Sequence, residues 1–368
     1  MSSASDRAGA LLTIDLDGVA ANWRALNDRI ASTVHCGAAV KADAYGLGAA
    51  RVAPALYAAG CRRFFLATID EAITLRPHLP DDAALIVLGG PLPGTNEDFV
   101  EHGLWPVLNT PQQVAQWSEA VESGGPVPPC VVHVDTGMSR LGLTVAELDH
   151  GAERLAALRP ALVMSHLACS EDGAEPMNAA QLATFRAMRL RLPDSAASLA
   201  NSGGIFLGAA YHFDLVRPGA ALYGVSPNPE AAAVLRQVIA LQGRILQVRD
   251  VDSPQTVGYG ATHRIRRKSR LATVAAGYAD GYLRSLSNRG HGIVGGIRVP
   301  LVGRVSMDLI IFDVTDAPEP LVRPGGFVEL IGPDHTVDDL ATEAGTIGYE
   351  ILTSLSPRYH RSYLGGAA

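Results

Sequence analysis

The sequence predicts an α/β protein, with a (β/α)8 barrel of the TIM type followed by a mostly β domain. Between residues 12 and about 225, short apolar runs alternate with helical patterns, and glycine-rich β runs then replace this alternation. Regular alternation of strands and helices over this length favours a closed parallel barrel. We therefore expect a barrel over residues 12–232 and a β domain over 233–368, with residues 1–11 free to pack against the latter.

The opening segment has the pattern of an amphipathic helix. Its apolar residues recur every three or four positions, at Leu16, Val19, Trp23, Leu26 and Ile30. Asp15 or Asp17 is placed to cap this helix. Eight apolar runs of strand length follow, most of them separated by twenty to thirty-five residues. They are Ala38–Lys41, Phe64–Thr68, Ala84–Leu88, Leu104–Leu108, Val131–Asp135, Leu162–His166, Leu199–Ser202 and Phe213–Arg217.

Most of these runs end at, or just before, a residue that can hydrogen-bond or react. These residues are Lys41, Thr68, Asn109, Asp135, His166, Asn201 and Arg217. In a barrel, the carboxyl ends of the strands face the loops that form the active site. Polar residues also simply mark where strands stop, which suffices for Thr68 and Asn109. A lysine, a histidine and an arginine at the same end favour a functional site.

Short β runs dominate after residue 232. They are Ala240–Val248, Leu271–Ala276, Ile293–Val302, Leu309–Val314 and Phe327–Ile331. A helix is predicted over Val337–Ala344, because Thr336 and Asp339 have the spacing of a capping box and Gly345 can end it.

Composition excludes several classes of protein. With 48% hydrophobic and 18% charged residues, the 368-residue chain is globular, and its net charge of −7 argues against a nucleic-acid partner. The four cysteines lack CxxC spacing, which indicates reduced thiols rather than disulfides or zinc ligands, and we expect no metal. No apolar run is long enough to span a membrane, and the N-terminus does not resemble a signal peptide. We expect a soluble, cytoplasmic protein with no membrane partner.

One lysine stands out. Of thirty Lys and Arg residues only Lys41 and Lys268 are lysines, and Lys268 lies in a basic run typical of a solvated surface. Lys41 instead ends an apolar run. A buried lysine can lose its proton, act as a base or nucleophile, and bond covalently to an aldehyde cofactor. A lysine at the rim paired with Asp43 explains the same pattern, and both interpretations stay open at this point.

Two later runs suit a phosphate group. Asn201-Ser202-Gly203-Gly204 offers a hydroxyl and backbone N–H groups, and Arg217-Pro218-Gly219 adds a cation and a close backbone approach. TIM barrels often bind phosphate after their seventh and eighth strands. Together with Lys41, this pattern favours pyridoxal 5′-phosphate. An arginine donating to the pyridine nitrogen would keep that nitrogen unprotonated and make the ring a weaker electron sink.

Several longer motifs resemble those of the alanine racemases, and they run in family order along nearly the whole chain. They are Ala39–Gly48, His133–Gly142, Ser165–Ala168, Asn201–Ser202, Phe213–Gly219, Gly258–Gly260, Gly277–Gly281, Gly303–Asp308 and Tyr349–Thr353. The resemblance implies a pyridoxal-phosphate-dependent isomerase that interconverts L-alanine and D-alanine and supplies D-alanine for cell-wall peptidoglycan.

The resemblance also implies roles for residues at matching positions. Lys41 would carry the cofactor and serve as the base on the D-side, and Tyr259 would be the opposite base. His166, bonded to Arg217, would tune Tyr259. The other implied cofactor contacts are Tyr45, Ser202 and Gly219 at the phosphate, Arg140 at the phenolic oxygen, and Asn201. Arg140 and the N–H of Met307 would hold the substrate carboxylate. In this family Tyr259 and Met307 come from the partner subunit, so the resemblance implies a homodimer with composite active sites.

Two positions depart from the family pattern. Many relatives have a carbamylated lysine where this chain has His133, so Arg140 must be oriented by the imidazole or by an anion. Relatives often have a tyrosine at the substrate entrance where this chain has Pro357, for which Tyr359 is a candidate substitute. Other positions matching the entrance are Glu171, Arg284 and Arg304.

Three other functions compete with alanine racemisation. A racemase that prefers serine or a broader set of amino acids is the main alternative, because an apolar pocket discriminates one small group by only about 1–3 kcal/mol. A non-catalytic carrier of the cofactor would leave the domain with Tyr259 and Met307 without a role. A barrel decarboxylase is disfavoured by the Gly-Tyr-Gly and Ser-Met-Asp runs.

Overall fold

The computed structural model describes residues 3–366, which form two compact units. The barrel unit contains residues 19–222 and 226–236. The β unit contains residues up to 18, residues 223–225 and residues 237–366. No helix of the described chain is long and apolar enough to cross a membrane.

The barrel unit is a closed ring of parallel strands. Its strands are β2 (His35–Cys36), β3 (Ala38–Ala39), β4 (Arg63–Leu66), β5 (Ala84–Val87), β6 (Trp105–Leu108), β7 (Val131–His133), β8 (Leu162–Met164), β9 (Ala196–Ser198) and β10 (Leu215–Val216). Seven of them, β3 to β9, pair side by side in sequence order, and β10 pairs with β2. β2 and β3 are two parts of one strand of the ring. Gly37, which lies between them, continues the pairing with β10, because its N–H donates to Val216 O at 2.9 Å. The N–H of Asp214 donates to Ala197 O at 3.0 Å, which brings β10 against β9. The predicted (β/α)8 barrel is therefore confirmed.

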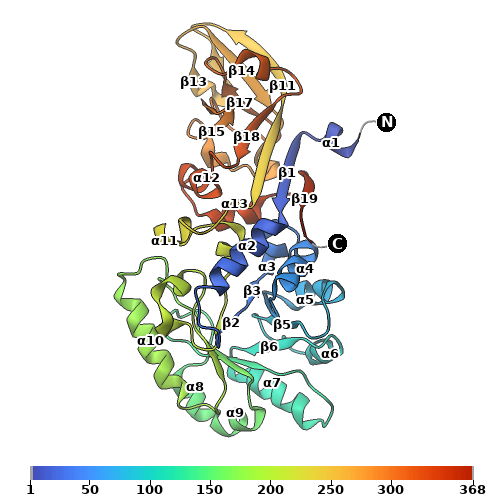
Figure 1. The fold of residues 1–368 in the computed structure, drawn as a ribbon, viewed down its shortest axis with the longest axis vertical. Coiled ribbons are helices and arrows are strands. Elements are labelled where there is room, and N and C mark those ends of the chain that lie inside the picture. Colours follow the sequence, from blue (N-terminus) through green and yellow to red (C-terminus); the bar gives the residue numbers. More distant parts are fainter. Residues whose placement is uncertain (1–2, 367–368) are drawn as a thin grey trace. The chain divides into compact units, whose positions relative to one another are not determined.

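The interior of the ring is filled by apolar side chains from successive strands, including Phe65, Ile86, Val107 and Val131. Each is 0–1% exposed, so truncating one such isoleucine to alanine costs about 2–5 kcal/mol of unfolding free energy. Helices surround the strands, as Figure 1 shows for α5, α6 and α7. The helices of this unit are α2 (Leu16–Asn27, which begins in the β unit), α3 (Lys41–Gly46), α4 (Ala49–Ala59), α5 (Ile69–Leu75), α6 (Asn96–Glu101), α7 (Pro111–Glu122), α8 (Val145–His150), α9 (Ala152–Leu158), α10 (Pro176–Arg189) and α11 (Pro229–Ala232), with short 3-10 turns at Arg76–His78, Gly203–Leu207, Ala209–Tyr211 and Ala220–Tyr223.

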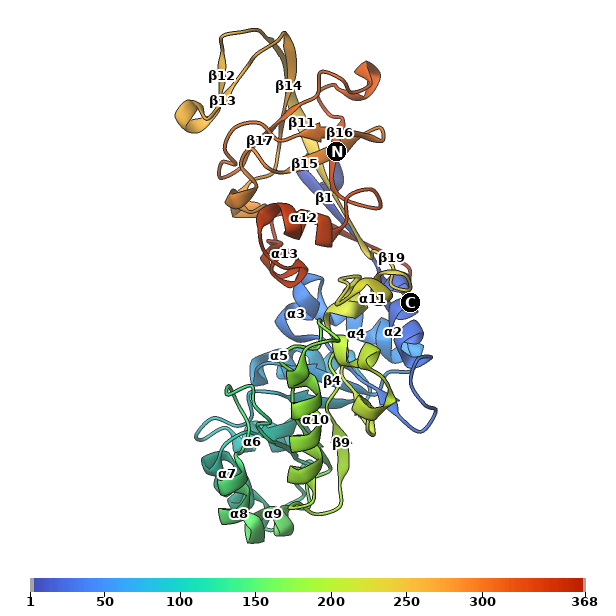
Figure 2. The same ribbon diagram turned by 90° about the vertical axis from the view of Figure 1, so that its left-hand side faces the viewer.

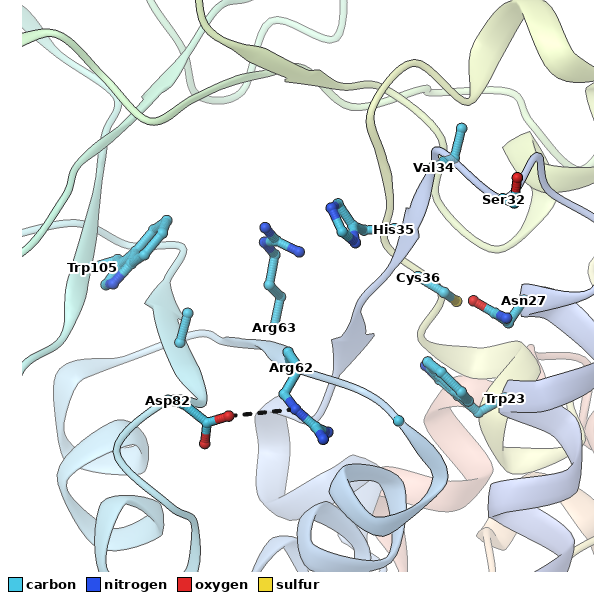
Figure 3. A pocket seen from close by; sticks show the side chains of 12 residues that line it. Trp23, Asn27, Ser32, Val34, His35, Cys36, Arg62, Arg63, Asp82 and Trp105 are labelled. Carbon is cyan, nitrogen blue, oxygen red and sulfur yellow. Dashed lines mark ion pairs between the residues drawn. The ribbon is translucent and has the colours of Figure 1, made fainter.

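A pocket lies at the amino end of the barrel strands (Figure 3). Arg63, Ala84 and Trp105 line it, and each is the first residue of a strand. An ion pair between Arg62 Nε and Asp82 (3.5 Å) closes part of its wall. Because Lys41 follows the carboxyl end of β3, this pocket is at the opposite end of the barrel from the predicted catalytic lysine.

The β unit is built on one long strand. β11 (Ile239–Val251) pairs with β1 (Ala10–Asp15), β18 (Phe327–Ile331) and β14 (Ser269–Val274), and a register shift lies between Ile245 and Gln247. Figure 2 shows β1 beside β11. The remaining elements are α1 (Ala4–Arg7), β12 (Thr256–Val257), β13 (His263–Arg264), β15 (His291–Val294), β16 (Ile297–Pro300), β17 (Ile310–Asp313), α12 (Val337–Ala344), α13 (Gly348–Ser354) and β19 (His360–Leu364), with 3-10 turns at Tyr259–Ala261, Tyr278–Asp280, Arg284–Leu286 and Glu319–Leu321.

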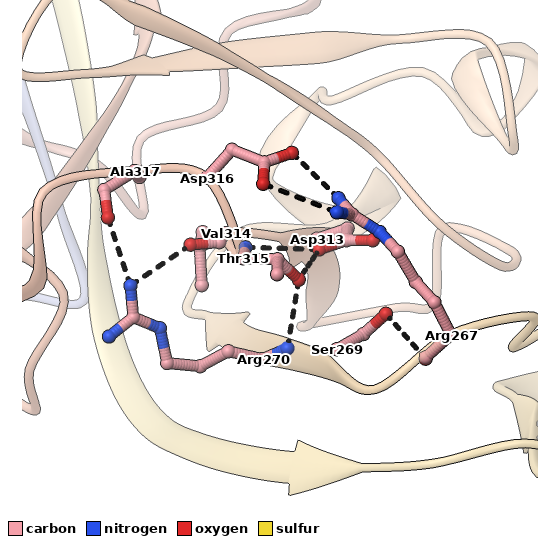
Figure 4. Close-up of polar contacts among 8 residues, drawn as sticks. All are labelled: Arg267, Ser269, Arg270, Asp313, Val314, Thr315, Asp316 and Ala317. Atoms are coloured by element: carbon pink, nitrogen blue, oxygen red, sulfur yellow. Dashed lines mark hydrogen bonds and ion pairs between the residues drawn. The ribbon is translucent and has the colours of Figure 1, made fainter.

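Local sequence explains most of these elements. β18 and α12 have the predicted bounds, and Thr336 and Asp339 form the predicted capping box. The predicted run Ile293–Val302 is a hairpin, because Gly295 (φ +57°) and Gly296 (φ +79°) form its tight turn. Polar contacts also hold β14 to the segment after β17 (Figure 4), where Arg270 donates to Ala317 O at 2.9 Å.

Candidate active site

Lys41 follows β3 and begins a backbone turn of unusual conformation. The four residues after it, Ala42, Asp43, Ala44 and Tyr45, all have φ between +52° and +55°. Left-handed backbone costs a non-glycine residue about 1–2 kcal/mol, so the surroundings must hold this turn in place. Such strain is typical of functional sites, where a side chain has to be aimed in one direction.

Two carboxylates hold the turn. Glu71 accepts hydrogen bonds from the N–H groups of Ala42 and Ala67, both at 2.8 Å. Asp43 accepts from the N–H of Ala49 at 2.7 Å, at the start of α4. Asp43 is thus used as a helix cap, and no ion pair joins it to Lys41 among the described residues. The arrangement therefore favours the interpretation of Lys41 as a reactive amine over the one that pairs it with Asp43.

The surroundings of Lys41 favour its neutral form. Burial lowers the pKa of the Lys41 amine, and the positive charge of Arg140 lowers it further. The carboxylate of Glu71 acts in the opposite direction and raises the pKa. An amine with a lowered pKa is a better nucleophile and base at neutral pH.

Ser202, Gly219 and Tyr45 form a small cradle at the same end of the barrel. The Ser202 hydroxyl accepts from the N–H groups of Gly219 (2.9 Å) and Ala221 (3.3 Å). A Cβ atom at position 219 would lie 2.4 Å from the Tyr45 hydroxyl, so only glycine fits there. Burial raises the pKa of Tyr45 to about 12, which keeps its hydroxyl protonated as a donor. Asn201 shapes the cradle by accepting from the N–H of Gly204 at 3.0 Å.

Arg217 is a buried, fixed cation. Its guanidinium donates to the Ser198 hydroxyl and to the carbonyl of Ser165, and its Nη2 lies 3.5 Å from Nδ1 of His166. Burial lowers the pKa of Arg217 to about 9, so the side chain stays protonated at neutral pH. Since arginine can only donate, Nδ1 of His166 is the acceptor, and the proton of the neutral ring is on Nε2.

Two histidines beside this cation are neutral. Burial, reinforced by the positive charges of Arg217 and Arg140, lowers the pKa of His166 to about 3 and that of His133 to about 4. His133 is 7% exposed, and its Nδ1 contacts Asn109. The ring of His133 is thus uncharged at neutral pH.

The loop that carries Arg140 is organised by Asp135. Its carboxylate accepts from the N–H groups of Gly137 (2.9 Å), Met138 (2.9 Å) and Ser139 (3.1 Å). The Arg140 side chain is exposed, and its charge acts on Lys41 and on both buried histidines. The structure thus brings Lys41, Tyr45, Arg140, His166, Asn201, Ser202, Arg217 and Gly219 to the carboxyl end of one barrel.

The other predicted site residues, Tyr259 and Met307, belong to the β unit. Tyr259 is 72% exposed and lies between Gly258 and Gly260, both with φ of +70°. Met307 is 53% exposed. Both side chains are thus largely exposed on the surface of the single chain. Tyr359, by contrast, is only 4% exposed, so it is not on the surface as a substitute for the entrance tyrosine would be.

Several residues that shape the site were not predicted from the sequence. Glu71 holds the strained turn, and Ser198 holds Arg217. Gln181 donates to Thr136 Oγ1 (3.1 Å) and to His166 O (2.9 Å), which fixes the ends of two strands. The capping pattern formed by Thr68 and Glu71 was the one local signal available.

Comparison with known proteins identifies the family. Residues 14–227 match the family described as "Alanine racemase, N-terminal domain", and residues 238–363 match "Alanine racemase, C-terminal domain". The chain is 53% identical over 363 residues to an alanine racemase of Rhodospirillum rubrum, covering 98% of this chain and 97% of the relative. It is 50% identical over 374 residues to that of Rhizobium meliloti, covering 98% of each chain.

Solved structures agree with this match. The crystal structure of an alanine racemase from Bartonella henselae, which has covalently bound pyridoxal phosphate, superimposes with a TM-score of 0.93 at 42% identity and covers 97% of this chain and 100% of that one. The biosynthetic alanine racemase of Pseudomonas aeruginosa gives a TM-score of 0.89 at 34% identity, covering 97% and 100%. These relatives do not favour a serine-preferring enzyme. The chain belongs to the alanine racemase family.

Proposed function

We propose that this chain interconverts L-alanine and D-alanine with pyridoxal 5′-phosphate bound covalently to Lys41. The observation that carries the proposal is the placement of Lys41. It is a partly buried amine with a lowered pKa, held on a strained turn at the barrel end that also carries a glycine-lined cradle. When bound, the cofactor stabilises negative charge that develops at Cα of the amino acid, and the protein residues move the proton.

The residues of the cradle fit the phosphate. The Ser202 hydroxyl and the Tyr45 hydroxyl are hydrogen-bond donors, and Gly219 leaves room because a Cβ there would collide with Tyr45. Asn201 keeps the loop in shape. Arg217 would hold the ring nitrogen of the cofactor. Because its guanidinium stays charged and only donates, it would keep that nitrogen unprotonated, which limits charge delocalisation and side reactions.

Two bases are needed to invert the centre, one on each face of Cα. Lys41 would remove and return the proton on the D-side, and Tyr259 would do so on the L-side. An isolated tyrosine has a pKa near ~10 and is a poor base at neutral pH, so it needs a neighbouring donor. The Nε2–H of His166 is such a donor, since Arg217 fixes its Nδ1 as the acceptor.

Substrate binding would use Arg140 and the backbone N–H of Met307 for the carboxylate. We propose that Tyr259 and Met307 act in the site of a partner subunit, so that the working enzyme is a homodimer. Their 72% and 53% exposure in the single chain supports this, because large apolar side chains left exposed are typical of interfaces. Size-exclusion chromatography with light scattering checks the stoichiometry, and a monomer that retains full activity would contradict the composite site.

The free cysteines bear on the cellular compartment in which the enzyme works. All four cysteines are free thiols, which suits a reducing compartment such as the cytoplasm. D-alanine made there would supply peptidoglycan synthesis.

The two lysines of the chain provide a matched test. Lys41→Ala and Lys41→Arg should abolish racemisation and the visible absorbance of the bound cofactor, since alanine has no amine and arginine stays protonated. Lys268→Ala, at an exposed position, should change neither. A colourless wild-type protein without cofactor would overturn the proposal, and so would a Lys41→Arg variant with normal activity.

A further inference from the structure

A second cluster of chemically competent side chains lies in the β unit. His291 is the first residue of β15, His335 precedes the cap of α12, and Glu343 is in the last turn of that helix. One nitrogen or oxygen atom from each of the three lies within 4.8 Å of the others. These residues, called the His-His-Glu cluster below, have no part in the racemisation mechanism.

The cluster converges on one carboxylate. Nδ1 of His291 contacts Oε1 of Glu343, and Nε2 of His335 lies 3.5 Å from Oε2 of the same side chain. The two imidazole rings are 3.9 Å apart between centroids and tilted by 35°. Both rings thus turn a nitrogen toward Glu343 from separate elements.

Both imidazole rings are buried beside the Glu343 carboxylate. His335 is 0% exposed and His291 is 6% exposed. Within residues 3–366, the side-chain contacts of Nδ1 of His291 and Nε2 of His335 are the ones with the Glu343 carboxylate. Two imidazole nitrogens aimed at one carboxylate form a set of three ligand atoms that a single ion can bridge in place of these direct contacts.

We propose that the His-His-Glu cluster binds a divalent transition-metal ion, for which Zn²⁺ is the natural probe. Two imidazoles and one carboxylate are a ligand set that zinc prefers, with a fourth position left for water. Bonds of about 2.0–2.1 Å to a tetrahedral ion place neighbouring ligand atoms roughly 3.4 Å apart. The separation of 3.5 Å between Nε2 of His335 and Oε2 of Glu343 matches this spacing, whereas Nδ1 of His291 lies closer to Oε1 of Glu343 and has to move apart from it to admit an ion. This proposal differs from the expectation of no metal that the sequence alone supports. The three ligands are too far apart in the sequence to form a recognisable metal-binding motif.

The charges around the cluster are compatible with a cation. Asp339, one helical turn before Glu343, adds a second negative charge, and its field acts on both imidazoles. Arg298 opposes a cation, since its Nη2 lies 2.8 Å from Oε1 of Glu343. The Arg298 side chain is 67% exposed, so it can turn to solvent when an ion takes its place.

An ion here would join three separate parts of the β unit. It would link β15, the turn that follows β18, and α12. His291 is paired with Pro300 of β16, and the segment with Met307 follows that strand. A bound ion would therefore stabilise the β unit, because a ligand that binds only the folded state raises its stability.

Metal content of the cofactor-loaded protein tests the proposal. The protein is treated with a chelator, dialysed against micromolar free Zn²⁺, and analysed for zinc per chain by mass spectrometry. We expect wild type to take up one zinc more per chain than Glu343→Gln or His335→Gln, and Zn²⁺ to raise its melting temperature while Mg²⁺ does not. His78→Gln, at an exposed histidine of the barrel unit, serves as the matched control and should bind as wild type does.

Two results would overturn the metal site. One is wild-type protein that takes up no zinc. The other is equal uptake by wild type and by Glu343→Gln, which would locate the ion elsewhere. Circular dichroism establishes whether each variant is folded. If His335→Gln is unfolded, Glu343→Gln alone decides the test, because glutamine has nearly the same size as the glutamate that it replaces.

Discussion

Nδ1 of His133 lies 2.8 Å from the side-chain oxygen of Asn109, and this contact determines where the imidazole carries its proton. The amide nitrogen of Asn109 donates to the carbonyls of Leu88 (3.0 Å) and Val107 (3.1 Å), so its oxygen faces the ring as an acceptor. Nδ1 must therefore be protonated, and Nε2 is left with a lone pair. His133 can accept a hydrogen bond from an arginine at that atom without carrying the charge of a carbamate.

The first prediction concerns the removal of His133. In His133→Ala, the buried oxygen of Asn109 loses its donor, which should lower the unfolding free energy by about 1–3 kcal/mol. Binding of alanine should weaken as well, because Nε2 of His133 is the acceptor that we assign to Arg140. Denaturant unfolding measures the first effect and the KM for alanine the second. The exposed His78→Ala is the control, and equal losses in both variants would refute the role assigned to His133.

Acid should destabilise the protein through its buried histidines. The folded-state pKa values of His133 (about 4) and His166 (about 3) lie below the ordinary value of 6.5, so the unfolded chain binds protons first as pH falls. Stability is therefore fully present above pH 6.5 and declines as pH drops from there toward about 4. These shifts correspond to about 3 kcal/mol for His133 and about 5 kcal/mol for His166. Melting temperatures between pH 8 and 4 measure the decline, and His133→Gln should make it shallower. A slope that this variant leaves unchanged would contradict the assignment.

Glu71 should control the protonation of Lys41. Glu71→Gln removes a negative charge that raises the pKa of Lys41, so the pKa should fall. Cofactor attachment, followed by its absorbance, should then persist to lower pH than in wild type. The variant should also be less stable by about 1–3 kcal/mol, because one of the two N–H groups that now donate to Glu71, from Ala42 and Ala67, would face an amide donor. Asp70→Asn makes the same charge change at an exposed neighbouring position, and an equal pH shift in that variant would exclude a specific role for Glu71.

Gly219→Ala should damage the phosphate cradle. The new Cβ would lie 2.4 Å from the Tyr45 hydroxyl, and either the side chain or the backbone must move. Overpacking of this kind costs about 1–3 kcal/mol, so cofactor affinity should fall by roughly tenfold or more. Gly125→Ala is a suitable control, since a Cβ there meets nothing within 4 Å. Cofactor titration of the two apoproteins compares them, and equal affinities would show that the cradle tolerates the added atom.

Much of the fold could be predicted from the sequence, because buried residues recur at regular spacings along strands and helices. Fully apolar runs marked the barrel strands, and the capping residues of α12 lie next to the helix that they start. The seventh strand was placed too late, at Leu199–Ser202, whereas β9 is Ala196–Ser198. Alanine and serine have low strand propensity, so their burial depends on the neighbouring strands and not on local pattern.

Other features depend on contacts between distant residues. β1 pairs with β19 across nearly the whole chain, as in the Leu11–His360 pair, and no local pattern indicates such a partner. The left-handed turn after Lys41 consists of residues that rarely adopt this conformation, so propensity argues against it. Family motifs, by contrast, identified the residues that the barrel gathers around Lys41, because each motif includes the strand end that positions it.

The central claim, that Lys41 and Tyr259 are bases on opposite faces, is tested most directly by hydrogen exchange in D₂O. Wild type should introduce deuterium at Cα of both alanine enantiomers and invert the centre. Tyr259→Phe should stop inversion in both directions, since the equilibrium between enantiomers is symmetric, yet still exchange D-alanine through Lys41 with retention. It should leave the Cα hydrogen of L-alanine in place. Exchange of L-alanine by Tyr259→Phe at the wild-type rate would contradict the account.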